Sequence, residues 1–206
     1  LLSLSAAPLA AGNTDERLTI VALGDSLTAG YMLGPDEGFS SQLEKALREA
    51  GHDNVTVVNA GVSGDTSSGG LARLDWAVGP EADAVIVELG ANDALRAIDP
   101  ELTRRNLTEI VSRLKDRGLP VLLAGMLAPP NLGRDYGESF NSIYPDLAES
   151  EGLILYPFFL DGVAGERSLN LADGIHPTAE GGGIIVERIL PKVENLIAEA
   201  RERKGG

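Results

Sequence analysis

Short, continuous apolar runs alternate along the chain with longer stretches in which apolar residues recur at helical spacing. Continuous apolar runs of this length are typical of strands that are buried on both faces of a parallel sheet. The pattern therefore predicts five buried strands, at Leu18–Leu23, Val55–Asn59, Ala84–Leu89, Pro120–Ala124 and Leu153–Tyr156.

The intervening segments predict helices with recognisable ends. Phe39 to Ala50 carries apolar residues at helical spacing, and Gly51 follows where a left-handed C-terminal cap belongs. Asp99 and Pro100 provide an N-cap and a first-turn proline for a second helix, which ends at Gly118.

The last predicted helix runs from about Thr178 toward Arg201. A proline inside a helix removes a backbone hydrogen bond, so we expect a kink or a break at Pro191. The glycine run Gly181–Gly183 is an unusual opening for a helix, and we expect it to leave this segment loose.

This alternation of strands and helices predicts an α/β fold. With right-handed crossovers it gives a three-layer αβα sandwich around a flavodoxin-like, doubly wound, five-stranded parallel sheet. The 206 residues are 43% hydrophobic and 23% charged, as in globular proteins, and no repeat or linker divides them. We expect residues 14–206 to form a single domain.

The charge balance narrows the choice of partners. Seventeen basic and 31 acidic residues give a net charge of -14, which repels phosphate backbones and anionic lipid surfaces. We therefore expect no nucleic-acid partner. No window has the roughly 18 continuous apolar residues that a membrane span needs, so we expect no stable membrane insertion. The oligomeric state is left open.

Residue types that are rare or missing exclude other chemistry. The chain has no cysteine, so it forms no disulfide and has no thiolate nucleophile or thiolate metal ligand. It has only two histidines, and His176 has no second histidine near it in sequence. We therefore predict no metal and no cofactor.

The first residues, Leu1–Gly12, form an apolar run rich in small side chains. Such a run resembles the end of a signal peptide, which favours a periplasmic or secreted protein. The alternative is a disordered N-terminus on a cytoplasmic protein. Residues 1–13 are therefore kept apart from the predicted domain.

Small and polar residues follow the predicted strands. Gly24–Thr28 follows the first, Ala60–Asp65 the second and Gly90–Asp93 the third, while Asp173–Pro177 comes after the fifth strand and a longer loop. Ligands of open α/β sheets bind beyond the carboxyl ends of the strands. We therefore expect these four segments to meet at one site.

The residues at these ends suit acyl transfer through a serine nucleophile. A serine hydroxyl needs an adjacent base, and imidazole, which titrates near neutral pH, makes His176 the expected base for Ser26. Asp173, three residues before the histidine, can orient the imidazole. The backbone N–H groups of Ser26 and Gly61 and the side-chain amide of Asn92 are candidate donors to an oxyanion.

Other residues near these segments are expected to serve the structure. We expect Asp25 to hydrogen-bond the loop around the nucleophile. Asp93 can either cap the following turn or support Asn92, and support is favoured. Asp65–Thr66 is typical of a helix start. Trp76 is expected to pack against the core.

Four segments together resemble the signature blocks of the GDSL, or SGNH, hydrolase superfamily. They are GDSLTAG at 24–30, NAGVSGDTSSGGLARL at 59–74, GAND at 90–93 and DGIHP at 173–177. Within that superfamily the chain is most similar to the bacterial, usually periplasmic, arylesterase/thioesterase/lysophospholipase group. The resemblance implies Ser26, His176 and Asp173 as a catalytic triad, with Gly61 and Asn92 in the oxyanion hole.

We therefore expect a carboxylic ester hydrolase that acts on small-molecule acyl esters or thioesters through an acyl-enzyme. The loop-rich segment after the fourth strand is the expected pocket wall, and its apolar side chains favour medium acyl or aryl groups: Leu127, Leu132, Tyr136 and Phe140.

Three alternatives are weighed against this function. A carbohydrate or peptidoglycan O-acetylesterase would share the fold and the catalytic residues. An α/β-hydrolase is disfavoured because Thr28 stands where its G-x-S-x-G elbow has glycine. A non-catalytic, flavodoxin-like binding module would leave Asn92 and His176 without a role.

Overall fold

The computed structural model describes residues 16–205, so the predicted signal-peptide remnant at residues 1–13 lies outside the described residues. The five predicted strands form one parallel sheet in the order β2-β1-β3-β4-β5, which is the flavodoxin-like order. Their bounds are β1 Leu18–Gly24, β2 Val55–Gly61, β3 Ala84–Glu88, β4 Val121–Ala124 and β5 Ile154–Tyr156. The predicted α/β fold is confirmed.

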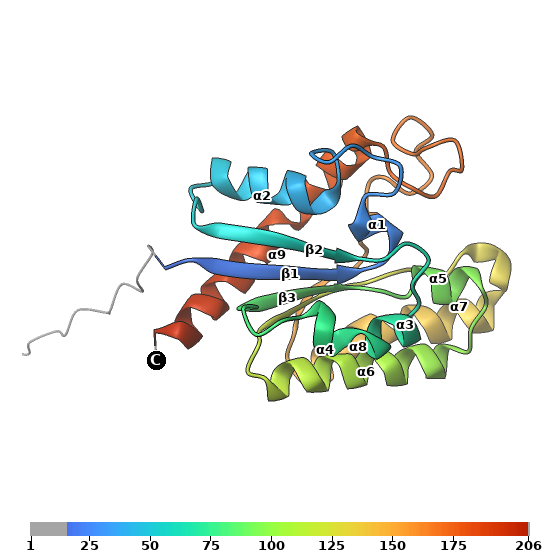
Figure 1. The fold of residues 1–206 in the computed structure, drawn as a ribbon. Helices are drawn as coiled ribbons and strands as arrows, with labels where there is room; N and C mark the ends of the chain where they lie inside the picture. Colours follow the sequence, from blue (N-terminus) through green and yellow to red (C-terminus); the bar gives the residue numbers. More distant parts are fainter. Residues whose placement is uncertain (1–15, 206) are drawn as a thin grey trace, which may run out of the picture.

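Helices cover both faces of the sheet and complete three layers (Figure 1). On one face, α2 (Phe39–Glu49) packs against the long α9 (Ala179–Lys204), close to the short α1 (Ser26–Ala29). The other face and the adjoining sheet edge carry the remaining elements, which are α3 Ser67–Ala72, α4 Leu74–Ala77, α5 Ala91–Leu95, α6 Pro100–Asp116, η1 Pro130–Leu132, α7 Arg134–Asn141 and α8 Ile143–Glu151.

The register of the sheet sets the level at which the following loops begin. In β1, Gly24 pairs with Gly61 of β2 on one side and with Glu88 of β3 on the other. All five residues of β3 are buried, as expected for a strand covered on both faces. The segments that follow these three strands therefore start side by side at one edge of the sheet.

The predicted ends of α6 are present in the structure. The Asp99 side chain accepts a hydrogen bond from the backbone N–H of Glu101, and Pro100 occupies the first turn. Gly118, just after the helix, has a φ of 74°, which is a backbone conformation that glycine adopts without strain. These local signals set where the helix begins and ends.

Helix α9 shows no break at Pro191, one of the two outcomes expected there, and the kink stays a prediction. Pro191 lies on the exposed side, where solvent can hydrogen-bond the carbonyl of Glu187. The predicted loose start at Gly181–Gly183 is wrong. Thr178 caps the helix there, and a Cβ on Gly181 would lie 2.3 Å from the carbonyl oxygen of Leu169. The glycines permit close packing.

The length and composition of the helices bear on whether one of them could span a membrane. Although α9 has 26 residues, none of the helices within residues 16–205 is long and apolar enough to cross a membrane.

Candidate active site

Ser26 is the first residue of α1 and follows directly on β1 and its N-cap residue, Asp25. The Asp25 side chain accepts a hydrogen bond from the backbone N–H of Leu27 at 3.0 Å, and this cap starts the helix at the serine. Gly30 ends the helix in a left-handed conformation. Ser26 is thus held at the carboxyl edge of the sheet with 8% of its surface exposed.

His176 joins Ser26 to Asp173 through its two ring nitrogens. Nε2 lies 2.8 Å from Ser26 Oγ, although the residues are 150 positions apart, and Nδ1 lies 2.8 Å from Asp173 Oδ2. Asp173 Oδ1 also accepts hydrogen bonds from the backbone N–H groups of Ile175 and His176. These bonds lower the pKa of Asp173 to about 2, the bond from Ile175 contributing most, and keep the carboxylate ionised.

The turn that carries the histidine is fixed by hydrogen bonds from the two residues Asn170 and Leu171 that precede it. The N–H of Leu171 donates to the carbonyl of His176 at 2.7 Å. The Asn170 amide donates to the carbonyls of Val163 and Glu166 at 2.7 and 2.9 Å, respectively. The histidine is therefore presented from an anchored loop, even though the turn itself is exposed.

Asn92 is supported by Asp25. Its side-chain amide donates to Asp25 Oδ2 at 3.1 Å, and burial raises the pKa of this fully buried carboxyl group to about 6. The expected support from Asp93 is wrong, because Asp93 instead accepts hydrogen bonds from Ser67 and Thr103. Asp93 therefore fixes α3 and α6 beside the site.

Glu88 is a buried carboxyl group near the site that the sequence analysis did not single out. It accepts a hydrogen bond from Thr28 Oγ1 at 2.7 Å, and its other oxygen has no hydrogen-bond partner among the described residues. Burial, and secondly the nearby Asp25 carboxyl, raise the pKa of Glu88 well above its ordinary value. Through this hydrogen bond, Glu88 connects β3 to α1, and its carboxyl group is poorly solvated.

Gly61 does not present a free donor, which corrects the sequence-based expectation. Its N–H donates to Asn59 Oδ1 at 2.9 Å, and a Cβ on Gly61 would lie 2.3 Å from the backbone nitrogen of Ala29. The glycine thus lets β2 approach α1 closely. In the turn that follows, Gly64 has a φ of 83° and its carbonyl accepts a hydrogen bond from Arg96 at 2.8 Å.

A cavity of about 500 Å³ opens beside the serine and the histidine. Ser26, Asn92 and His176 supply polar groups at its wall. Most of the remaining wall is apolar and comes from the segments after β3, β4 and β5, including Leu95, Met126, Leu127, Phe158, Leu160 and Ile175. The cavity is therefore suited to an apolar group next to the serine hydroxyl.

Of the four predicted pocket residues, only Leu127 lines this cavity, and the assignment of Leu132, Tyr136 and Phe140 is corrected. Residues 134–141 form α7 rather than a loop, and the helical turn directs Phe140 into the core. Phe140 stacks there with Tyr136 at a centroid distance of 6.0 Å and contacts Tyr144 edge-on. These rings support the floor beneath the site instead of forming its wall.

The sequence analysis missed the wall residues that follow β5. Phe158 and Leu160 line the cavity, whereas Phe159 between them is fully buried in the core. The chain bends at Pro157 and turns at Phe159 and Leu160, and this turn directs the neighbouring side chains to different sides. The signal in the sequence was the apolar run Phe158–Leu160, which follows the fifth strand after Pro157 and lies outside any predicted element.

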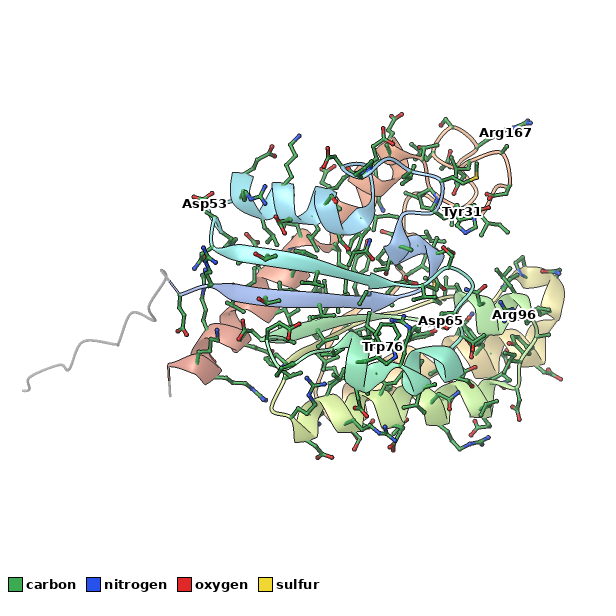
Figure 2. All side chains as sticks on the ribbon, viewed as in Figure 1. Tyr31, Asp53, Asp65, Trp76, Arg96 and Arg167 are labelled. Carbon is green, nitrogen blue, oxygen red and sulfur yellow. The ribbon has the colours of Figure 1, made fainter. Side chains whose placement is uncertain are left out.

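Arg73 is a buried cation that joins the ends of two strands. It donates to Asp65 Oδ2 at 2.5 Å and to the carbonyls of Ala60 and Gly24 at 2.7 and 2.8 Å. Trp76, expected in the core, is instead 72% exposed on α4, with its ring 6.0 Å from the guanidinium carbon of Arg73 (Figure 2). The indole covers this cation on the surface.

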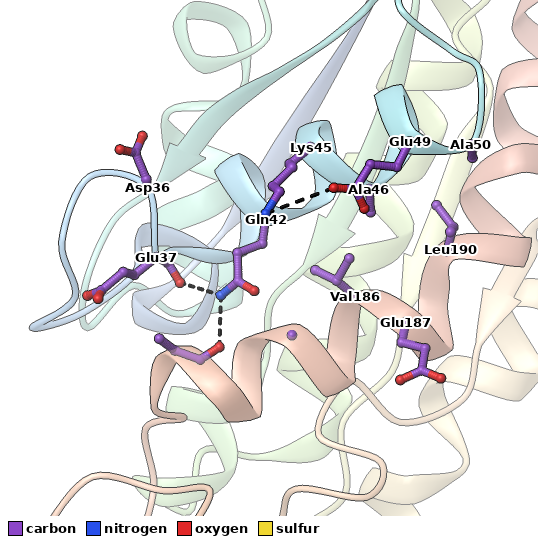
Figure 3. Close-up of a pocket in the computed structure, with 12 residues that line it drawn as sticks. Asp36, Glu37, Gln42, Lys45, Ala46, Glu49, Ala50, Val186, Glu187 and Leu190 are labelled. Carbon is purple, nitrogen blue, oxygen red and sulfur yellow. Dashed lines mark hydrogen bonds and ion pairs between the residues drawn. The ribbon is translucent and has the colours of Figure 1, made fainter.

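A second hollow, of about 640 Å³, lies between α2 and α9 (Figure 3). Gln42 bridges the carbonyls of Glu37 and Ala179 there, and Lys45 pairs with Glu49. No serine or histidine is among the described residues that line it. Across residues 16–205, no group of three or more histidine, aspartate or glutamate side chains is arranged to hold a metal ion. The chemistry is concentrated at the sheet edge.

A parallel α/β sheet with a hydrogen-bonded serine, histidine and aspartate beside an apolar cavity is typical of hydrolases that use a serine. The model of the GDSL-like Lipase/Acylhydrolase family matches residues 22–184, a range that includes all four sequence blocks. The chain belongs to this family. This family match, together with an arylesterase among the relatives, confirms the expectation that the protein is a carboxylic ester hydrolase.

Individual relatives agree with this assignment. The chain is 42% identical to an arylesterase of Vibrio mimicus over 185 residues, 89% of this chain and 91% of the relative. It is 36% identical to thioesterase 1/protease 1/lysophospholipase L1 of Escherichia coli over 180 residues, 87% and 85% of the two chains. The crystal structure of TesA superposes with a TM-score of 0.81 at 40% identity, covering 86% of this chain and 99% of TesA.

Proposed function

We propose that the protein hydrolyses acyl esters or thioesters through an acyl-enzyme on Ser26, with His176 as general base and Asp173 as its orienting carboxylate. The observation that carries this proposal is the unbroken pair of 2.8 Å contacts from Asp173 through His176 to Ser26. This hydrogen-bonded series ends at the mouth of an apolar cavity, where an acyl group can bind next to the nucleophile.

In the acylation step, Ser26 Oγ attacks the carbonyl carbon while His176 Nε2 takes the hydroxyl proton. The resulting tetrahedral intermediate collapses, the bond to the leaving oxygen or sulfur breaks, and the imidazolium returns the proton to the leaving group. Water then attacks the acyl-enzyme by the same route and releases the acid. Asp173 stays ionised throughout and stabilises the imidazolium.

The oxyanion is stabilised in this mechanism by donors at the strand ends. The backbone N–H of Ser26 lies in the first turn of α1, where helix N–H groups have no intrahelical partner. Asn92 has a second amide hydrogen besides the one that it donates to Asp25. Because the N–H of Gly61 is bonded to Asn59, we assign the third donor to Gly64, in the next turn of the same loop.

The composition of the cavity supports an apolar acyl or aryl group as the part of the substrate that binds there. Leu95, Met126, Phe158 and Leu160 offer few hydrogen bonds to a sugar, which disfavours the O-acetylesterase alternative. The volume of about 500 Å³ is within the usual range for small-molecule sites. The names of the arylesterase and thioesterase relatives support the same substrate classes.

A chain-length series of p-nitrophenyl esters, with an acyl thioester and an acetylated sugar, tests the proposal. We expect kcat/KM to rise from acetate to medium acyl chains, and Ser26→Ala to abolish turnover. A fluorophosphonate probe should label the parent protein at Ser26. A non-catalytic binding module would not react with the probe. Strong preference for acetate together with faster cleavage of the acetylated sugar would establish the O-acetylesterase alternative instead.

A further inference from the structure

Tyr31 lies against the ring of His176. The two ring centroids are 4.5 Å apart and the planes are tilted by 37°. Tyr31 is 41% exposed and comes from the loop after α1, whereas His176 comes from the turn 145 positions further along the chain. Figure 2 shows Tyr31 beneath the loop that follows β5, so two distant segments meet at this contact.

The backbone fixes Tyr31 relative to the nucleophile. The carbonyl oxygen of Ser26 accepts hydrogen bonds from the N–H of Gly30 and, at 3.1 Å, from the N–H of Tyr31. Met32, the next residue, has a φ of 58°, an uncommon conformation for a residue with a side chain. The chain therefore turns sharply after Tyr31, and serine and tyrosine belong to one short, rigid unit.

The imidazole of His176 is held at its edges by Asp173 and Ser26, as shown above, but these two contacts leave tilting about the line between them unopposed. The side chain retains 19% exposure, and the turn that carries it is exposed from Ala172 to Ile175. Tyr31 is the aromatic ring that packs on the face of the imidazole among the described residues. It supplies the restraint that the edge contacts lack.

Resting on the proposed function, we propose that Tyr31 is a positioning residue for the general base. Its ring holds the imidazole of His176 in the orientation that reaches Ser26 and stabilises the imidazolium that forms when the serine proton is taken. Aromatic faces attract cations within about 6 Å of the ring centroid, and the observed 4.5 Å lies inside that range.

The ring, rather than the phenol, carries this role. None of the hydrogen bonds found within residues 16–205 involves the Tyr31 hydroxyl. Tyr31 also does not line the cavity assigned to the acyl group. Removing the ring should therefore slow the proton-transfer steps and leave the binding of the acyl group unchanged.

The test compares Tyr31→Leu, which removes the ring, with Tyr31→Phe, which keeps it. For Tyr31→Leu we expect kcat on the best nitrophenyl ester to fall by about tenfold, with KM unchanged. This loss is smaller than the rate enhancement of about 10² to 10⁴ that a general base contributes. The rate of fluorophosphonate labelling at Ser26 should fall in parallel. Tyr31→Phe should stay within about twofold of the parent, since general-base positioning needs only the ring.

Trp76→Leu serves as a control, because it also removes an exposed aromatic ring, here one that lies on α4, away from His176. It should leave kcat and labelling unchanged. The proposal is overturned if Tyr31→Leu keeps the parental kcat, if only KM changes, or if Tyr31→Phe is as slow as Tyr31→Leu. Should Tyr31→Leu fail to fold, Tyr31→Trp is measured instead, and it must retain kcat.

The proposed function fails separately, since in that case the parent protein itself would neither turn over esters nor react with the probe at Ser26. If the parent protein is active and Tyr31→Leu is labelled at the same rate as the parent, only the role of Tyr31 is overturned.

Discussion

The side-chain amide of Asn92 donates a hydrogen bond to the buried carboxyl group of Asp25 across 3.1 Å. The same carboxyl group accepts the N–H of Leu27 and so caps the helix that begins with Ser26. One buried acid thus sets both the position of the nucleophile and the orientation of the amide proposed to bind the oxyanion. It belongs to the signature block GDSL but has no part in the proton transfer.

Asp25→Asn tests this relationship. The new amide oxygen can still accept from Leu27, but its NH₂ group then faces the NH₂ group of Asn92, and two donors cannot bond to each other. Asn92 must turn away from the oxyanion. We expect kcat to fall by about 10- to 100-fold, less than the 10² to 10³ that loss of a whole oxyanion donor costs, with little change in KM.

Steady-state kinetics of Asp25→Asn, Asn92→Ala and the double variant provide the control. Because both changes act through one amide, their effects on kcat should not multiply. If the losses in kcat multiply fully, Asp25 acts on catalysis by a route that does not include Asn92.

The triad residues should also contribute unequally. Ser26→Ala and His176→Ala should each nearly abolish turnover, and the double variant should be no worse, since the two groups act as a unit. Asp173→Ala should retain more activity, because the imidazole can still accept the serine proton without its orienting carboxylate. Single-turnover rates with a nitrophenyl ester measure these differences. Additive losses at Ser26 and His176 would contradict a shared step.

The raised pKa of Glu88 predicts that the free energy of unfolding depends on pH. Its pKa in the folded protein lies above the value in the unfolded chain, so the unfolded chain releases this proton first as the pH rises. The free energy of unfolding therefore declines above the unfolded pKa, and the decline levels off above the folded pKa. Glu88→Gln removes this contribution, and the variant should gain stability relative to the parent as the pH rises from 5 to 8.

Urea unfolding at several pH values measures the difference. Glu202→Gln, which removes an exposed carboxylate on α9, is the control, and its difference from the parent should change less with pH. A constant difference between Glu88→Gln and the parent across this pH range would show that Glu88 is ionised in the folded protein as readily as in the unfolded chain.

The two leucines Leu160 and Leu132 distinguish the observed pocket from the one expected from the sequence. Leu160 lines the cavity, whereas Leu132, in η1, does not. Leu160→Ala should lower kcat/KM for medium-chain esters by about 5- to 20-fold through lost apolar contact, and leave acetate nearly unaffected. Leu132→Ala should leave the chain-length profile unchanged. The opposite result in the ester series would place the acyl group against Leu132 instead of Leu160.

The convergence of Ser26, Asn92 and His176 was predictable because it depends only on topology. The carboxyl ends of parallel strands meet at one edge of the sheet, and short apolar runs already locate those ends. The structure brings Ser26, His176 and Asp173 into hydrogen-bond contact and leaves Asn92 in the same cavity wall. Their catalytic roles stay predictions, which the kinetics above test.

Contacts that depend on the direction of a single side chain were not predictable. Phe140 and Trp76 are both aromatic residues on short helices, yet one is fully buried and the other 72% exposed. Which face of such a helix meets the core is set by packing partners that are distant in sequence. Likewise Asp25 and Asp93 both lie near Asn92, and only the three-dimensional arrangement shows that Asp25 bonds to it.

The glycine run of α9 supplies a matched pair of substitutions. A Cβ on Gly181 would lie 2.3 Å from the carbonyl of Leu169, a rigid backbone atom in the loop that leads to Asp173 and His176. Gly181→Ala should therefore lower the free energy of unfolding by about 1 to 3 kcal/mol through overpacking. It should also lower kcat, because the shifted loop carries the base.

Gly183→Ala, two residues further along the same helix, is the control. Its Cβ would lie 3.2 Å from Gln42 Oε1, a side-chain atom that needs to shift by only a few tenths of an ångström. Alanine is the better helix former by about 1 kcal/mol, so this variant should be as stable as the parent or slightly more stable. Thermal unfolding and ester hydrolysis of the two variants measure the contrast. Equal stability of both would mean that the start of α9 is as loose as its glycines suggest, and that the Leu169 contact does not hold the histidine loop.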